Sequence, residues 1–164
     1  MHAFCTYCSS SKRQDPGEIP AIDRYKSPRI NRIHSAARQV GVEFFILSGK
    51  FGLIPPNQPL PYYDHLLELK EVPALVELVS SQTREYGIHA VVYFTKSPRD
   101  SNLLPYLTVI LIACSITDVQ CHVVDLEERD MSSWRDIMRA AEDAKLALIS
   151  DRSTGESQFQ SLLR

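Results

Sequence analysis

The chain has 164 residues, 44% of them hydrophobic, and a formal net charge of −2 at pH 7. This length fits one globular domain with a single core, which we expect over residues 1–150, followed by a flexible tail over residues 151–164. The nearly neutral charge excludes a global basic field for sequence-independent nucleic-acid binding. The N-terminus has no apolar signal core and the longest apolar run, residues 103–113, is too short to cross a bilayer, so we expect a soluble cytoplasmic protein without membrane contact.

The first strand is expected over residues 3–8, and it runs into the polar loop Cys8-Ser9-Ser10-Ser11-Lys12. This loop offers hydroxyls, backbone N–H groups and one ammonium, which suits it to hold a phosphate or a polar base edge. It lacks the glycine pattern of a P-loop, so the binding of a nucleoside triphosphate is not implied. A solvated loop with an exposed lysine is the alternative.

The four cysteines are Cys5, Cys8, Cys114 and Cys121. They stand in apolar contexts rather than in a dense disulfide framework, so we expect reduced thiols. Cys5 and Cys8 have CxxC spacing, but no second pair or histidine spacing completes a zinc ligand set. We therefore predict structural or loop-lining thiols and no metal, ahead of a redox motif of the thioredoxin type.

Residues 14–20 contain two prolines and a glycine and predict a turn-rich excursion. A helix follows from Ser27-Pro28, where serine can cap and proline can occupy the first turn, to Gly41. Arg24, Arg29 and Arg32 form a basic run around the start of this helix. They could face phosphates, although a solvated helix face is the commoner explanation of such a run.

The second strand is expected over residues 42–47, and Ser48-Gly49-Lys50-Phe51-Gly52 follows it as a glycine-flanked turn. Four prolines then restrict the loop that leads to Tyr62, Tyr63, Asp64 and His65. Adjacent tyrosines can stack on a nucleobase, and Asp64 with His65 can supply acid–base chemistry. The alternative is core-filling aromatics, with Asp64 capping a short helix over residues 65–70.

The second half of the chain continues the alternation of strands and helices. It predicts a helix over residues 73–86, a third strand over 89–95, a polar loop over 95–99 that contains Lys96, a buried helix over 103–116, a fourth strand over 120–126 and a final amphipathic helix over 132–148.

Four short apolar strands that alternate with helices predict an α/β fold. We expect three layers, with a mostly parallel four-stranded sheet and helices on both faces. In such sheets the ligand crevice lies outside the carboxyl ends of the strands. The polar loops over residues 8–12, 48–52 and 95–99 would therefore meet at one edge of the sheet and form a binding site there.

Several motifs occur in a recognisable order: Cys8-Ser9-x-x-Lys12, Tyr25-x-Ser27, the stretch ILSGKFGLIP over residues 46–55, and Pro61-Tyr62-Tyr63-Asp64. Together they resemble a small uncharacterised bacterial and phage domain family related to the YaaA-like peroxide-stress proteins. A more distant similarity is to a domain of archaeosine synthase, with a loop of the Cys-Ser-x-x-Lys type and a downstream Tyr-Asp. The resemblance implies an α/β domain associated with nucleic acids or modified nucleobases.

The sequence therefore favours an enzyme of nucleobase or nucleotide modification, a transferase or hydrolase whose cofactor the sequence does not name. We expect Asp64 to do acid–base work, Lys12 to contact phosphate or a base carbonyl, and Cys8 to be a nucleophile. The other predicted ligand-binding residues are Ser9, Ser10, Ser48, Gly49, Lys50, Tyr62, Tyr63 and His65. The alternatives are a non-enzymatic nucleic-acid-binding stress protein that uses the arginine face, and a domain that works only with a partner protein or a second copy of itself.

Overall fold

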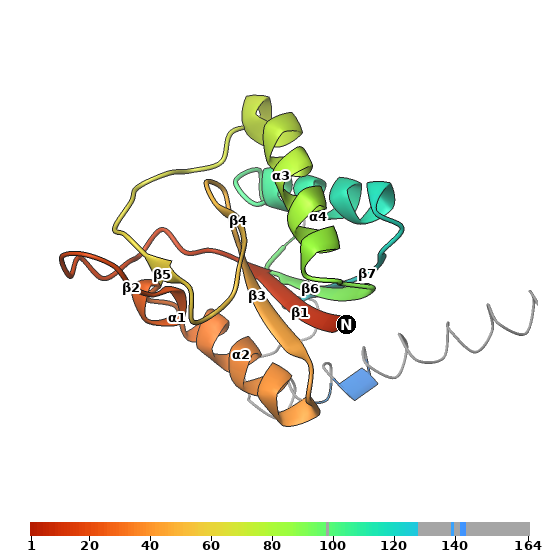
Figure 1. Cartoon of the computed structure of the whole chain (residues 1–164), viewed down its shortest axis with the longest axis horizontal. Coiled ribbons are helices and arrows are strands. Elements are labelled where there is room, and N and C mark those ends of the chain that lie inside the picture. Colours follow the sequence, from red (N-terminus) through yellow and green to blue (C-terminus); the bar gives the residue numbers. More distant parts are fainter. Residues whose placement is uncertain (98, 128–138, 140–141, 144–164) are drawn as a thin grey trace, which may run out of the picture.

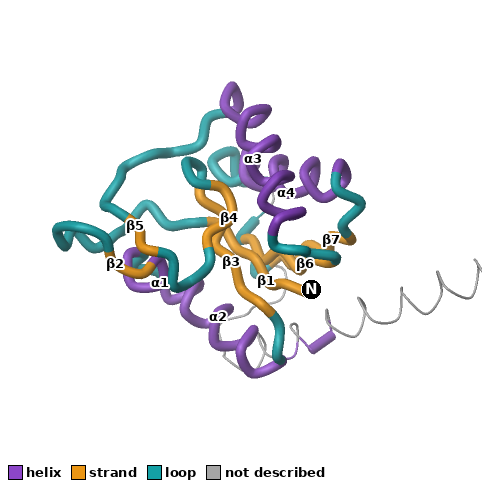
Figure 2. Tube along the Cα trace, viewed as in Figure 1, coloured by secondary structure: helices purple, strands orange, loops and turns teal. Residues whose placement is uncertain are grey.

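The computed structural model describes residues 1–97, 99–127, 139 and 142–143. Its strands are β1 (His2–Tyr7), β2 (Ile19–Pro20), β3 (Glu43–Ser48), β4 (Gly52–Ile54), β5 (Pro59–Leu60), β6 (Ala90–Thr95) and β7 (Gln120–Asp125). Its helices are α1 (Ala21–Arg24), α2 (Pro28–Val40), the 3-10 turn η1 (Leu69–Glu71), α3 (Val72–Glu85) and α4 (Leu104–Ile116). Figures 1 and 2 show how these elements are arranged.

The strands form a five-stranded sheet in the order β4-β3-β1-β6-β7, and β2 pairs with β5 in a separate small sheet. β1 lies parallel to both β3 and β6, and β6 lies parallel to β7. The predicted α/β class with a mostly parallel sheet is thus confirmed. The predicted count of four strands is wrong, because β4 turns back after the glycine-flanked turn and adds an antiparallel edge strand to β3.

The helices cover the sheet because alternate residues of each buried strand point to opposite faces. On β3, the ring of Phe44 packs on His34 of α2, whereas the ring of the next residue, Phe45, packs on Tyr86 at the end of α3. Figure 1 accordingly shows α2 on one side of the sheet and α3 with α4 on the other. The predicted start of α2 is confirmed: the Ser27 side chain accepts a hydrogen bond from the Ile30 N–H, and Pro28 is the first helical residue.

The short helix predicted over residues 65–70 is wrong. Residues 61–68 are not helical, and the single 3-10 turn that follows begins at Leu69. Its cap is Glu68, whose backbone N–H donates to the Glu71 carboxylate, so Asp64 is free of the capping role.

Other predictions fall on the part of the chain that the structure leaves undescribed. The final helix over residues 132–148, the domain end at residue 150 and the tail over 151–164 all lie outside the described residues. The three-layer arrangement as a whole therefore stays a prediction. None of the described helices is both long and apolar enough to span a membrane.

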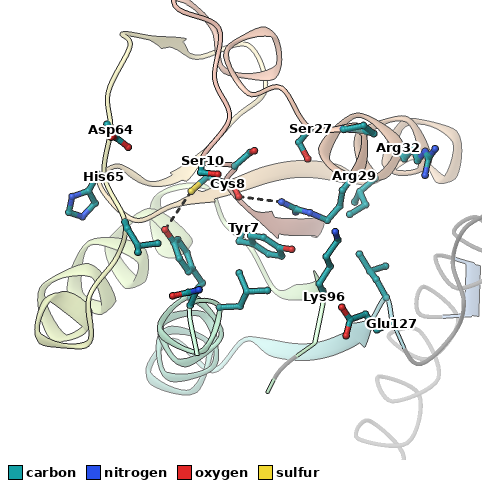
Figure 3. Close-up of a pocket in the computed structure, with 18 residues that line it drawn as sticks. Tyr7, Cys8, Ser10, Ser27, Arg29, Arg32, Asp64, His65, Lys96 and Glu127 are labelled. Atoms are coloured by element: carbon teal, nitrogen blue, oxygen red, sulfur yellow. Dashed lines mark hydrogen bonds between the residues drawn. The ribbon is translucent and has the colours of Figure 1, made fainter. Parts of the chain in front are cut away.

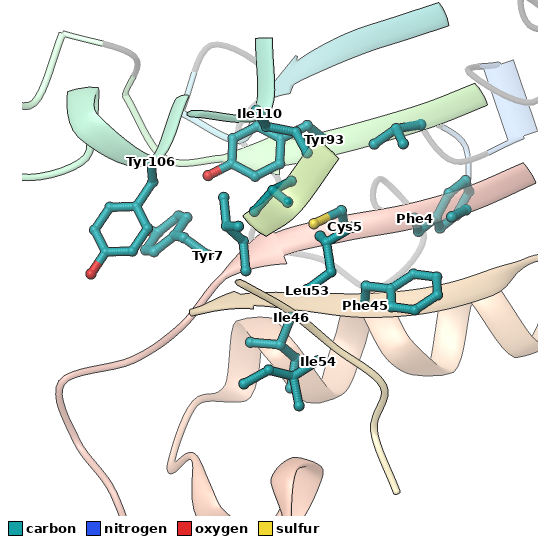
Figure 4. Close-up of a cluster of buried hydrophobic side chains, with 14 of the residues drawn as sticks. Phe4, Cys5, Tyr7, Phe45, Ile46, Leu53, Ile54, Tyr93, Tyr106 and Ile110 are labelled. Atoms are coloured by element: carbon teal, nitrogen blue, oxygen red, sulfur yellow. The ribbon is translucent and has the colours of Figure 1, made fainter. Parts of the chain in front are cut away.

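The core lies on both faces of the three central strands, and every residue of β6 is buried. Figure 4 shows the cluster around Phe4, Phe45 and Tyr93, which also contains the thiol of Cys5. All four cysteines are free, and no group of residues that could hold a metal occurs in the described part of the chain. Cys5 faces the core while Cys8 lines a cavity, so the CxxC spacing does not bring the two thiols to one site.

Candidate functional site

A cavity of about 870 Å³ opens at the carboxyl ends of β1, β6 and β7 (Figure 3). This is the edge at which parallel α/β sheets bind their ligands. Its walls come from the segments that follow these strands, from the first turns of α2 and α4, and from the loop before η1. The lining residues are Tyr7, Cys8, Ser9, Ser10, Ser27, Pro28, Arg29, Arg32, Ile33, Asp64, His65, Leu66, Lys96, Asn102, Leu103, Tyr106, Leu126 and Glu127.

One wall of the cavity is cationic. Arg29 and Arg32 come from the first turns of α2, and Lys96 follows the end of β6. Figure 3 shows these three side chains on the same side of the cavity, together with the carboxylate of Glu127. Arg32 and Lys96 are exposed, whereas Arg29 is half-buried.

The guanidinium of Arg29 is held in place on three sides. Its carbon lies 3.5 Å from the centroid of the Tyr7 ring, in a cation–π contact. One terminal nitrogen donates to Thr6 Oγ1, and the other donates to the Cys8 carbonyl over 3.2 Å. Burial lowers the pKa of Arg29, while the neighbouring Tyr7 acts in the opposite direction.

The opposite wall carries Asp64 and His65 (Figure 3). His65 Nε2 lies 3.2 Å from Glu71 Oε1, so the imidazole pairs with the end of η1 rather than with Asp64. Asp64 is exposed and has no ion-pair partner among the described residues. Of the predicted acid–base pair, Asp64 has an unpaired carboxylate, whereas one imidazole nitrogen of His65 is paired with Glu71.

Cys8 lies between the two walls. Its thiol donates to the Tyr106 hydroxyl over 3.7 Å. Burial, with Cys8 next in importance, raises the pKa of Tyr106. Since the side chain of Cys8 is 8% exposed and faces the cavity, it is the thiol that a bound molecule would meet.

Lys12, Tyr25, Ser48 and Tyr63 form a buried polar cluster. The Tyr63 hydroxyl is hydrogen-bonded to the Tyr25 hydroxyl and, over 2.9 Å, to Ser48 Oγ. The Lys12 ammonium lies 4.5 Å from the centroid of the Tyr63 ring. Burial is the main cause that raises the pKa of Tyr63 to about 12. None of the four residues lines the cavity, so the structure separates Lys12, Ser48 and Tyr63 from the other predicted site residues.

The structure also shows which of the other predicted ligand-binding residues line the cavity. Lys50 and Tyr62 are exposed and do not line the cavity. Gly49 is buried, and a Cβ added to it would lie 2.9 Å from Leu67 Cβ and 3.1 Å from the Tyr106 hydroxyl. Gly49 therefore permits close packing against the loop before η1. Of the predicted set, the cavity brings together Cys8, Ser9, Ser10, Asp64 and His65.

The three arginines of the predicted basic face do not lie on one surface. Arg24 is completely buried, and its guanidinium donates to the backbone carbonyls of Arg13, Asp15, Gly17 and Leu60. It ties the excursion between β1 and α1 to β5 and is not available to a nucleic-acid phosphate. Arg29 and Arg32 turn to the cavity instead.

Sequence reasoning missed several lining residues, above all Tyr7 and Tyr106, and it assigned Arg29 and Arg32 to a helix face rather than to the cavity. Arg29 and Arg32 carried a usable signal, because they directly follow a Ser-Pro helix start in a chain expected to bind ligands at strand ends. Tyr106 gave no such signal, since it stands in a continuous apolar helix and looks like a core residue.

Compared with models of known protein families, with curated proteins and with solved structures, the chain gives no match. The resemblance to YaaA-like proteins therefore stays a prediction.

Proposed function

We propose that this domain is an enzyme that modifies or processes a nucleobase or nucleotide in the cavity at the carboxyl edge of its sheet. The observation that carries the proposal is that three cations and the carboxylate of Glu127 lie on one side of the cavity and the exposed carboxylate of Asp64 on the other, with a thiol between them. A volume of about 870 Å³ is in the range of small-molecule sites.

The lining residues suit the two parts of such a ligand. Arg29 and Lys96 suit an anionic group, because guanidinium and ammonium groups form strong charge-assisted hydrogen bonds with phosphate oxygens. Tyr106 offers an aromatic ring and a hydroxyl for the base, the role that the sequence assigned to Tyr62 or Tyr63. Ser9 and Ser10 add hydroxyls on the loop between the two walls.

Two side chains of the cavity can take part in the proposed reaction. Asp64 can orient or deprotonate a water or a ligand hydroxyl, since its carboxylate is exposed and unpaired among the described residues. Cys8 can act as the nucleophile of a group transfer, in which its sulfur bonds to the transferred group while the leaving group departs with the thiol proton; in the free protein this thiol is hydrogen-bonded to the Tyr106 hydroxyl. In this proposal Lys12 supports Tyr63 rather than the ligand.

The first test is the identity of any small molecule that the purified full-length chain retains, measured by mass spectrometry after denaturation. A nucleotide, a nucleoside or a purine analogue would support the proposal. A retained molecule without a nucleobase, such as a lipid or a sugar acid, would contradict it.

The second test is turnover of the retained molecule, followed by chromatography with mass detection. We expect Asp64→Asn to lower turnover by at least roughly a hundredfold, as is usual for loss of a general acid or base. Asp23→Asn removes an exposed carboxylate from α1, outside the cavity, and is the matched control. Equal turnover in both variants would remove Asp64 from the chemistry.

A further inference from the structure

We infer that the wall formed by Arg29, Arg32 and Lys96 is a phosphate subsite, and that the ligand is a nucleoside monophosphate rather than a free base or a polynucleotide. The phosphate assignment stands on the geometry of the wall. The nucleoside part rests on the proposed function. The residues that the sequence suggested for this contact, Lys12 and Lys50, do not line the cavity.

The guanidinium of Arg29 is pre-oriented to bind an anion. Its guanidinium has five N–H donors, and the described residues supply acceptors for two of them, Thr6 Oγ1 and the Cys8 carbonyl. No carboxylate of the described residues pairs with it. The contacts with Thr6, Cys8 and Tyr7 fix its orientation, so little side-chain entropy is lost when the remaining donors meet a ligand.

Arg32 and Lys96 complete the wall. Both are exposed, both line the cavity, and neither has a carboxylate partner in the described part of the chain. Glu127 is the acidic residue that lines the cavity in addition to Asp64, so the three cations of the wall outnumber these two carboxylates. The wall also lies at the start of α2, a 13-residue helix whose N-terminal end carries partial positive charge.

The same geometry favours a terminal phosphate over the backbone of a nucleic acid. A polynucleotide needs a continuous basic track, because its affinity comes from several phosphates at once. Here the preceding arginine of the run, Arg24, is buried and bound to backbone carbonyls. The cations instead converge on one cavity, where their three positive charges and the one negative charge of Glu127 leave a net charge of +2, which matches the two negative charges of a phosphomonoester.

The test compares matched ligands by calorimetry in a buffer free of phosphate and sulfate. The ligands are the common nucleosides, their 5′-monophosphates, inorganic phosphate and a single-stranded oligonucleotide. The variants are Arg32→Gln and Lys96→Gln, both at exposed positions, with Arg38→Gln as the control because Arg38 is exposed on the same helix but outside the cavity. Circular dichroism checks that each variant is folded.

We expect a monophosphate to bind at least roughly tenfold more tightly than its nucleoside, the ratio expected of one charge-assisted contact. Arg32→Gln and Lys96→Gln should each remove most of that advantage and leave nucleoside affinity unchanged. Arg38→Gln should change neither affinity.

Each result decides between the two proposals. Equal affinity for a nucleoside and its monophosphate would overturn the subsite and leave the proposed function standing. Binding of inorganic phosphate that depends on Arg32, with no binding of any nucleoside or nucleotide, would keep the subsite and overturn the proposed function. Tighter, Arg32-dependent binding of the oligonucleotide would overturn the assignment to a monophosphate.

Discussion

Arg24 shows how a single buried charge can organise a loop. The chain between β1 and α1 contains little that could form a core of its own, and its backbone carbonyls need partners. The Arg24 guanidinium, which is completely buried, binds the carbonyls of Arg13, Asp15 and Gly17 on this excursion and that of Leu60 on β5. The planar fork of arginine suits this arrangement, whereas the single ammonium of lysine does not.

Arg24→Lys should therefore destabilise the protein by about 2–4 kcal/mol, because it keeps the charge but leaves buried carbonyls without donors. The measurement is the midpoint of urea unfolding. Arg38→Lys, at an exposed position on α2, should change the free energy of unfolding by less than about 0.5 kcal/mol. Equal effects of the two substitutions would mean that the carbonyl contacts of Arg24 contribute little.

Tyr63 makes stability depend on pH in the alkaline range. Burial is the largest cause that raises its pKa from 10.0 to about 12. Below pH 10 the phenol is protonated in both the folded and the unfolded chain, so its full contribution is present. As the pH rises from 10 to 12 the unfolded chain loses the proton first, and stability is lost progressively.

Tyr63→Phe should reduce this alkaline loss, by up to about 3 kcal/mol between pH 10 and 12. It should also cost about 1 kcal/mol at neutral pH, because Ser48 loses a hydrogen-bond partner. Unfolding curves measured across this pH range test both expectations. Tyr62→Phe is the matched control, since the neighbouring Tyr62 is 48% exposed, and an identical pH slope in both variants would contradict the assignment.

At the scale of elements, β4 depends on one glycine. Gly52 has φ +71°, and a Cβ at this position would lie 2.1 Å from Gln82 Oε1. Gln82 cannot simply move away, because its carboxamide accepts from the Leu53 N–H over 2.7 Å and donates to the Phe51 carbonyl over 3.0 Å. The turn after β3, the edge strand β4 and α3 are therefore joined at this point.

Gly52→Ala should cost about 2–4 kcal/mol, the sum of backbone strain and the disturbed Gln82 contacts. Gly17→Ala separates the two terms: Gly17 has φ +75°, but a Cβ there would meet nothing within 4 Å. It should cost only about 1–2 kcal/mol, the backbone term alone. If chemical denaturation gave the two variants the same stability, the role of Gln82 would be disproved.

At the scale of the whole molecule, the sequence predicted the location of the cavity better than its lining. Parallel strands require that Cys8 and Lys96 emerge at one edge, and both do line the cavity. Lys12 was misplaced because the chain bends after the loop and forms a bridge with Tyr25, which turns its side chain onto Tyr63. Such a tertiary contact leaves no periodic signal in the sequence.

The edge strand β4 and the cationic wall also could not be predicted from the sequence pattern. β4 has only three residues, fewer than a hydrophobic pattern needs to show alternation. Arg29 was visible as part of a charged helix start, but whether that start faces solvent or a cavity depends on how α2 returns to the sheet.

The rates at which the thiols are alkylated test whether the proposed ligand binds in the cavity. Cys8 reaches solvent through the cavity, while Cys121 is half-buried on β7 and does not line it. Iodoacetamide should alkylate both, and peptide mass spectrometry can follow each rate separately.

A nucleoside 5′-monophosphate that occupies the cavity should slow alkylation of Cys8 at least roughly tenfold when present at ten times its Kd, since only the free protein reacts. The rate at Cys121 should not change. Equal protection of both thiols would indicate a general stabilisation of the fold, and no protection of Cys8 would place the nucleotide outside this cavity.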